Sequence, residues 1–156
     1  MRPVLLALLL LLAPAIARAQ SLDDSPPVYV ASVYDRLAKG ETFEAPDALY
    51  TPRLLALWKD MERDAAGEVG RLDASYWTNS QDWTLSEISI SSAYVDKHDN
   101  DRMIVVARFR NMDRNEMIQF YFEKIGDQWK LDDVVSLGEE AWTLSLVLKY
   151  GWAGEN

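Results

Sequence analysis

The stretch from Leu85 to Val134 decides the fold and reads LSEISISSAYVDKHDNDRMIVVARFRNMDRNEMIQFYFEKIGDQWKLDDV. It contains four runs rich in β-branched and aromatic residues, and groups of Asp, Asn and Gly separate these runs. Residues of these two kinds favour strands and turns respectively, so the pattern predicts an antiparallel β-meander. The predicted strands are Ser86–Val95, Met103–Phe109, Glu116–Glu123 and Gln128–Val135.

The fourth predicted strand contains a change of phase. Trp129 and Leu131 share one face of this strand, but Val134 is out of phase with them. An extra residue in one strand of a pair produces such a change, so the pattern predicts a β-bulge near Asp132 and Asp133. The bulge would redirect these two carboxylates.

Two helices are predicted before the sheet. The first carries an apolar stripe at the i, i+3, i+4 and i+7 spacing. The stripe consists of Val30, Val33, Tyr34 and Leu37. The second helix has Thr51 as its N-cap and Pro52 at its first position, and Gly67 is expected to end it.

The segment after the sheet is compatible with two structures. Ser136 and Glu139 have the spacing of a capping box, which favours a helix that runs to Tyr150. Residues 143–147 are also β-compatible, which favours a fifth strand. The sequence does not decide between the helix and the strand.

The N-terminus has the three parts of a secretory signal peptide. A basic start precedes an apolar run from Val4 to Ile16, and a small-x-small site follows at residues 17–19. The apolar run is shorter than the about 20 residues that a membrane span needs. We therefore expect cleavage after Ala19, a flexible leader over residues 20–27 and a single periplasmic or secreted domain over residues 28–152.

Composition limits the possible partners. Loss of Arg2 and Arg18 with the signal peptide reduces the 16 basic residues to 14, which against 25 acidic residues is a formal net charge of −11. Nucleic-acid binding requires a basic stripe, and none is visible, so we predict no nucleic-acid partner. The chain contains no cysteine, so we expect neither disulfides nor a lipid anchor, and no stable membrane insertion after cleavage. The oligomeric state is open.

A cluster of acidic residues surrounds the only histidine. Asp96, Asp99 and Asp101 lie close to His98 between the first two predicted strands. A calcium loop requires a glycine at its sixth position and a glutamate at its twelfth, and counting from Asp96 or from Asp99 meets neither requirement. A zinc site would need further soft ligands. We therefore predict a solvated turn, with neither a metal nor a cofactor.

The connector from residue 68 to residue 84 holds the most distinctive string, Asn79-Ser80-Gln81-Asp82-Trp83. Long connectors without secondary structure are often functional. Asp82 and the pair Asp132-Asp133 lie beside aromatic residues, where burial would raise the pKa of a carboxyl group toward a value useful for acid–base chemistry. In the structural interpretation, Asp82 caps a loop and the pair fixes the bulge. Position alone does not choose between the two.

Several strings together match one known pattern. They are Tyr34 in the first helix, the helix start from Tyr50 to Leu57, Asp73-Ala74-Ser75 leading into Ser80-Gln81-Asp82-Trp83, and the closing string from Gly126 to Val134. On these residues the chain, over most of Val28 to Tyr150, resembles an uncharacterised family of secreted bacterial proteins with a nuclear-transport-factor-2-like (cystatin-like) fold. The resemblance implies an α+β fold in which a curved antiparallel sheet wraps around N-terminal helices to form a cone with an open end.

Proteins of this superfamily include isomerases and dehydratases with pocket aspartates, and also binding or assembly modules without catalysis, so the fold does not choose a function. We expect a non-catalytic binding or accessory domain that engages a small ligand or a protein partner at the open end of the cone. The residues expected at this rim are Gln81, Asp82, Trp83, Trp129, Asp132 and Asp133.

The alternative hypothesis is an isomerase- or hydratase-like enzyme. Its general base would be Asp82 or Asp132. Its hydrogen-bond donor would be Tyr76, Tyr94 or Tyr121. A cavity of roughly 300 Å³ that holds one of these carboxyl groups with a raised pKa would favour the enzyme, whereas aromatic side chains that fill the cone would count against it.

Overall fold

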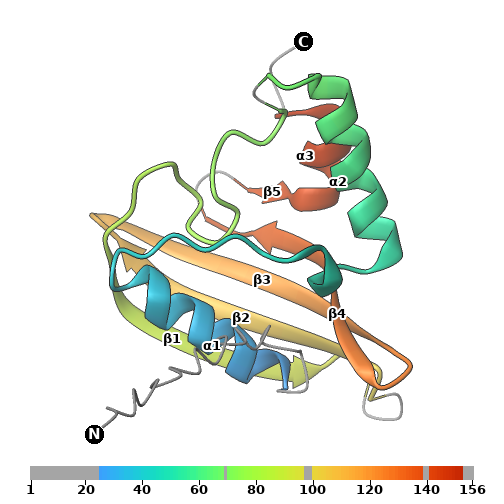
Figure 1. Cartoon of the computed structure of the whole chain (residues 1–156). Coiled ribbons are helices and arrows are strands. Elements are labelled where there is room, and N and C mark those ends of the chain that lie inside the picture. Colours follow the sequence, from blue (N-terminus) through green and yellow to red (C-terminus); the bar gives the residue numbers. More distant parts are fainter. Residues whose placement is uncertain (1–24, 69, 97–99, 139–140, 153–156) are drawn as a thin grey trace, which may run out of the picture.

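The computed structural model describes residues 25–68, 70–96, 100–138 and 141–152. These residues form an α+β fold with one antiparallel sheet of five strands and three α-helices (Figure 1). The predicted signal peptide lies outside the described residues, as do His98, Asp99 and Glu139. Among the described helices, none has the length and apolar character that a membrane crossing requires.

The predicted meander is confirmed. The strands are β1 (Leu85–Tyr94), β2 (Arg102–Asn111), β3 (Arg114–Ile125), β4 (Gln128–Ser136) and β5 (Trp142–Thr143), and they lie side by side in chain order. Alternate residues of β2 and β3 are buried, so one face of the sheet carries the core. The buried apolar residues of these two strands are Met103, Val105, Ala107, Phe109, Ile118, Phe120 and Phe122.

The predicted bulge in β4 is also confirmed. Tyr121 of β3 pairs with Asp133, and the next residue, Phe122, pairs with Leu131. Asp132 is therefore the extra residue of the bulge. Because of this insertion, Leu131 and Val134 are both fully buried although three positions separate them.

The helices pack on two parts of the sheet. α1 (Pro26–Leu37) lies against β1 and β2, whereas α2 (Pro52–Ala65) and α3 (Leu144–Tyr150) pack together and against β4 (Figure 1). A 3₁₀ turn, η1 (Asp47–Leu49), precedes α2. The N-cap of α2 is confirmed, since the Leu54 N–H donates to Thr51 Oγ1 over 3.2 Å.

Two sequence expectations need adjustment at the ends of the fold. α1 begins at Pro26, inside the residues expected to form the leader, because proline is favourable at the first positions of a helix. In the C-terminal segment, Leu144–Tyr150 form the helix α3, which ends at the predicted residue, and the strand β5 that precedes it has only two residues. Ser136 belongs to β4, so it does not start this helix.

Aromatic side chains fill the space between α1 and the sheet. The ring of Trp77 stacks on that of Phe120 with centroids 4.7 Å apart, and the ring of Tyr34 lies 5.2 Å from that of Phe109. The Tyr34 hydroxyl donates to the Trp77 carbonyl oxygen over 2.7 Å, which satisfies both polar groups within the core. This filling is the arrangement that counts against the enzyme hypothesis.

Candidate functional site

The structure does not bring together the six residues expected at one rim. Trp83 directly precedes β1, at the end where Leu85 pairs with Asn111. Trp129 pairs with Lys124 beside the turn between β3 and β4, at the opposite end of the sheet (Figure 1). A strand of ten residues such as β2 spans roughly 30 Å, so the structure does not bring the two tryptophans together.

Asp132 joins the bulge to the start of α2. Its Oδ1 accepts hydrogen bonds from Thr51 Oγ1 over 2.9 Å and from Arg53 Nε over 3.1 Å. The Arg53 guanidinium also lies 3.1 Å from Asp132 Oδ2 and 3.6 Å from Asp133 Oδ2. The hydrogen bond to Asp132 raises the pKa of the Arg53 side chain, because it stabilises the charged guanidinium.

Asp133 joins the same bulge to α3. Its Oδ1 accepts from the Ser145 backbone N–H over 3.0 Å, and its Oδ2 accepts from the Ser145 hydroxyl over 2.6 Å. Since Ser145 is in the first turn of α3, the carboxylate satisfies an N–H that the helix leaves without an internal acceptor. These contacts support the structural interpretation of the aspartate pair.

Gln81, Asp82 and Trp83 form a surface segment beside the end of α1. The Trp83 indole N–H donates to the Leu37 carbonyl oxygen over 3.1 Å, which fastens the connector to the helix. Gln81 and Asp82 are exposed. The Ser80 hydroxyl donates to the main-chain oxygen of Asp82 over 2.6 Å, and this bond fixes the backbone rather than the carboxylate.

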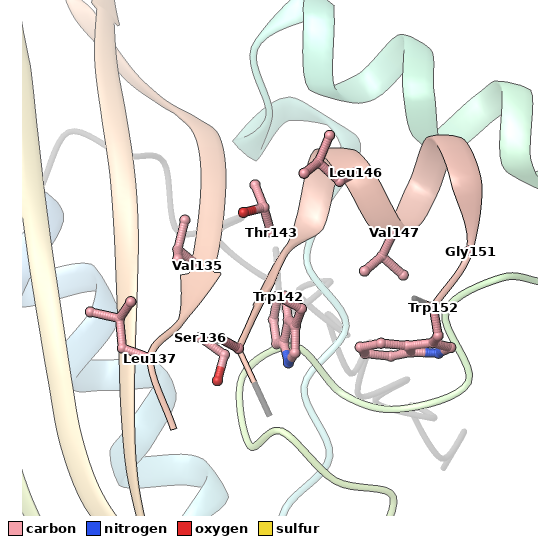
Figure 2. Close-up of a pocket in the computed structure, with 10 residues that line it drawn as sticks. Val135, Ser136, Leu137, Trp142, Thr143, Leu146, Val147, Gly151 and Trp152 are labelled. Carbon is pink, nitrogen blue, oxygen red and sulfur yellow. The ribbon is translucent and has the colours of Figure 1, made fainter. Parts of the chain in front are cut away.

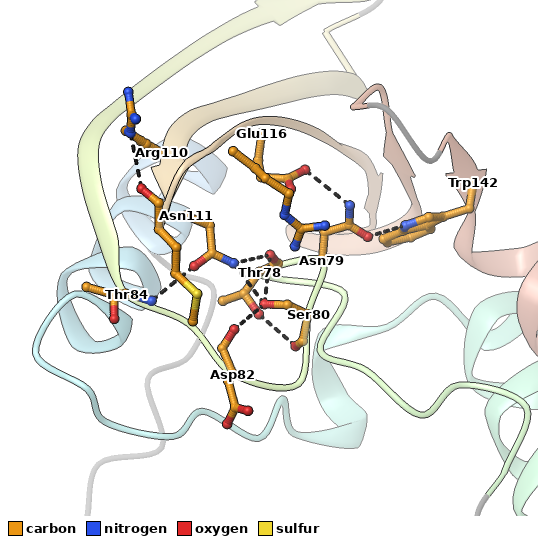
Figure 3. Close-up of polar contacts among 11 residues, drawn as sticks. Thr78, Asn79, Ser80, Asp82, Thr84, Arg110, Asn111, Glu116 and Trp142 are labelled. Carbon is orange, nitrogen blue, oxygen red and sulfur yellow. Dashed lines mark hydrogen bonds and ion pairs between the residues drawn. The ribbon is translucent and has the colours of Figure 1, made fainter.

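The structure reveals a buried polar network that sequence reasoning missed (Figure 3). Asn79 accepts from the Trp142 indole N–H over 2.6 Å and donates to Glu116 Oε2 over 3.1 Å. Glu116 is only 5% exposed, and the Arg114 Nε lies 3.6 Å from its other oxygen. Asn79 has a φ of +54°, a left-handed conformation that asparagine tolerates better than most residues. The connector string was the only sequence signal for this network.

Asn111 fastens the same connector to the end of β2. Its side-chain oxygen accepts from the Thr84 backbone N–H over 3.0 Å, and its amide donates to Ser80 Oγ over 2.8 Å (Figure 3). Asn111 is almost completely buried. The distinctive string of the connector therefore has a demonstrated structural role, because its side chains satisfy buried polar groups.

A pocket of about 680 Å³ opens between β4, β5 and α3 (Figure 2). Its walls include the indoles of Trp142 and Trp152, whose ring centroids lie 6.0 Å apart, and the aliphatic side chains of Leu146 and Val147. Ser136 also lines the pocket, and it is fully buried. Within the described part of the chain its hydroxyl has no hydrogen-bond partner. We call this cavity the apolar pocket, because apolar side chains form most of its walls.

Another cavity, of about 350 Å³, has Asp132 and Tyr121 among its lining residues. Its size meets the expectation for an enzyme, but both polar groups already have partners in the chain. Asp132 is paired with Arg53, and the Tyr121 hydroxyl donates to Gln119 Oε1 over 2.8 Å. A general base needs an oxygen that is free to accept the substrate proton, so this arrangement gives the enzyme hypothesis little chemical support.

The described residues contain no candidate metal site. Among those residues, no group of three or more histidine, aspartate and glutamate side chains is arranged to hold a metal ion. Asp99 of the acidic cluster and the neighbouring His98 lie outside the described residues.

Comparisons with family models, with curated proteins and with solved structures found no match to this chain. The geometry of the cavities is therefore the basis for a functional proposal.

Proposed function

We propose that the chain is a secreted, non-catalytic binding domain that takes a small apolar ligand in the pocket between β4, β5 and α3. The observation that carries this proposal is the pocket of about 680 Å³ with indole and aliphatic walls, which also includes Ser136, whose hydroxyl has no hydrogen-bond partner among the described residues. Ligand pockets are typically apolar cavities of this size with a few polar groups that orient the ligand.

The proposal includes a fold assignment that is more specific than α+β. We infer a nuclear-transport-factor-2-like cone, because the chain order of helices and antiparallel strands agrees with the one that the sequence resemblance implies. The location of the pocket differs from the expected rim. It lies at the β5 edge of the sheet, where Trp142 and α3 cover the end of β4.

Secretion is supported by the sequence. The apolar run from Val4 to Ile16 and the small-x-small site at residues 17–19 have the features of a signal peptide. A direct test is N-terminal sequencing of the protein recovered from the periplasm or the medium of bacteria that express the full chain. A first residue of Gln20 supports the proposal, and an intact N-terminus in the cytoplasm contradicts it.

The proposed pocket can be tested with a neutral apolar fluorophore, N-phenyl-1-naphthylamine, whose emission rises in an apolar site. Leu146 lines the pocket and is 55% exposed, so Leu146→Asp introduces a charge there without disturbing the core. We expect it to weaken probe binding by about tenfold or more, since a charge at an apolar wall is costly to desolvate. Ile125, 44% exposed at the β3–β4 turn, provides the matched control Ile125→Asp.

The outcome separates the proposal from nonspecific binding. Loss of binding in Leu146→Asp with unchanged binding in Ile125→Asp supports the pocket. Equal binding by the wild-type chain and both variants, or no binding by any of them, overturns it.

A further inference from the structure

A further cavity, of about 270 Å³, is lined by aromatic and acidic side chains. Three segments enclose it: the connector before α2, one face of α2 and the connector that follows α2. Its aromatic lining residues are Phe43, Tyr50, Trp58, Tyr76 and Trp77. We call this cavity the aromatic pocket.

The rings of the aromatic pocket form a continuous wall. The ring of Trp58 lies 6.0 Å from that of Tyr50 and 6.2 Å from that of Tyr76. The Tyr76 ring is 5.1 Å from that of Trp77, which meets Phe43 edge-on at 5.5 Å. The faces of aromatic rings carry partial negative charge and attract cations within about 6 Å.

Carboxylates lie among the rings. Glu44, Asp47 and Glu62 line the aromatic pocket, and its described lining residues include no lysine or arginine. Lys59 balances part of this charge, since its Nζ lies 3.2 Å from Asp47 Oδ2 and 3.2 Å from Glu62 Oε2. The lining residues themselves carry an excess of negative charge.

The protein already places one of its own cations on this wall. The Arg36 guanidinium lies over the ring of Phe43, 5.2 Å from its centroid. Arg36 also pairs with Glu41 over 3.2 Å, so its charge is shared with a carboxylate that does not line the pocket. The contact shows that a ring of this wall accepts a cation on its face.

The aromatic pocket also offers hydrogen-bond donors. The hydroxyls of Tyr50 and Tyr76 lie 3.0 Å apart, so one donates to the other and the second proton remains available. Burial raises the pKa of Tyr50 to about 12 and that of Tyr76 well above its usual value, so both hydroxyls keep their protons near neutral pH. The indole nitrogens of Trp58 and Trp77 are buried without a hydrogen-bond partner in the described structure.

We propose that the aromatic pocket binds a small organic ammonium ion that also carries a hydrogen-bond acceptor. The ammonium group lies against the ring faces of Trp58 and Tyr50, close to Glu62. The acceptor receives a proton from the tyrosine pair. This inference does not depend on the apolar pocket, because none of the residues that line one cavity lines the other.

Two probes of the same shape isolate the role of charge. Choline carries a quaternary ammonium and a hydroxyl, and 3,3-dimethylbutan-1-ol replaces the charged nitrogen by carbon. In isothermal titration calorimetry with the secreted chain, we expect choline to bind at least about tenfold more tightly than the alcohol, as cation–π contacts with two rings imply. Equal affinities for choline and the alcohol would refute the proposal that the site selects a cation. If choline does not bind, the proposed site is refuted.

Variants of α2 test the carboxylate and the lysine. Glu62→Gln is expected to weaken choline binding by about threefold to tenfold. Asp60→Asn is its matched control, because Asp60 is exposed on the same helix, pairs with Arg63 and does not line the pocket. Lys59→Met removes the competing cation and is expected to strengthen binding severalfold. Equal effects of Glu62→Gln and Asp60→Asn, or weaker binding in Lys59→Met, overturn the assignment.

Discussion

The carboxylate of Asp133 caps α3 from a neighbouring strand, with its two oxygens 3.0 Å from the Ser145 backbone nitrogen and 2.6 Å from the Ser145 hydroxyl. N-caps usually come from the residue just before the helix, but the N-cap position here, Thr143, makes no side-chain cap bond. The bulge at Asp132 turns Asp133 toward the helix. One inserted residue thus couples the closing strand to the C-terminal helix.

Replacement of Asp133 by alanine is expected to lower the free energy of unfolding by about 2 kcal/mol, because the variant loses the cap and the charge-assisted bond to the Ser145 hydroxyl. Urea denaturation followed by tryptophan fluorescence measures this change. Asp35→Ala, at an exposed position of α1, serves as the control and should stay within about 0.5 kcal/mol of the wild type. An equal loss in the two variants contradicts the capping role.

Replacement of Asn79 by alanine is expected to cost about 2 to 3 kcal/mol, since it leaves the Trp142 indole N–H and the Glu116 carboxylate without their shared partner. Thermal unfolding followed by circular dichroism provides the measurement. The exposed Asn115 offers the control Asn115→Ala, which should change the stability little. A stability of Asn79→Ala within error of the wild type would show that the network contributes nothing.

Replacement of Gly138 by alanine is expected to destabilise the fold by about 1 kcal/mol, because the added Cβ would lie 2.8 Å from Glu116 Oε2 and push this oxygen away from Asn79. A double-mutant cycle identifies the cause. If the alanine acts through the bond between Glu116 and Asn79, its cost is smaller in an Asn79→Ala background. Additive effects would indicate a different origin.

The stability of the wild-type chain is expected to fall as the pH rises from 10 toward 12. Burial raises the pKa of folded Tyr50 from 10.0 to about 12, so the unfolded chain loses this proton first and is favoured in that interval. The contribution of Tyr50 is full below pH 10 and is lost as the pH passes the folded pKa, a change of about 2 kcal/mol. Urea denaturation at several pH values should show a smaller decrease for Tyr50→Phe. An identical decrease in both chains would contradict the assignment.

Local patterns predicted much of the architecture. Alternation and turn residues located four strands, the phase change between Leu131 and Val134 located the bulge, and Thr51 marked the start of α2. Each of these features depends on residues close together in the chain, which is why sequence reasoning reaches them. The β5 strand was harder to recognise, since two residues are too few to show a period.

The candidate sites were not predictable in the same way. The connector string was singled out for its composition, but its role depends on Glu116 and Asn111, which lie more than thirty positions further along the chain. The aromatic pocket was also missed, because Tyr50, Trp58 and Tyr76 each have a local explanation as helix or core residues. Only their approach across three segments produces a cavity.

By itself, the sequence determined the order of the first two helices and the four long strands, the position of the bulge and the acidic character of the chain, because side-chain periodicity, turn chemistry and charge are properties of neighbouring residues. The tertiary structure alone decided which side chains meet. Pairing register placed Trp83 and Trp129 at opposite ends of the sheet, and long-range hydrogen bonds fastened the connector. Register and connector path depend on contacts between distant segments, and these contacts determined where the cavities formed.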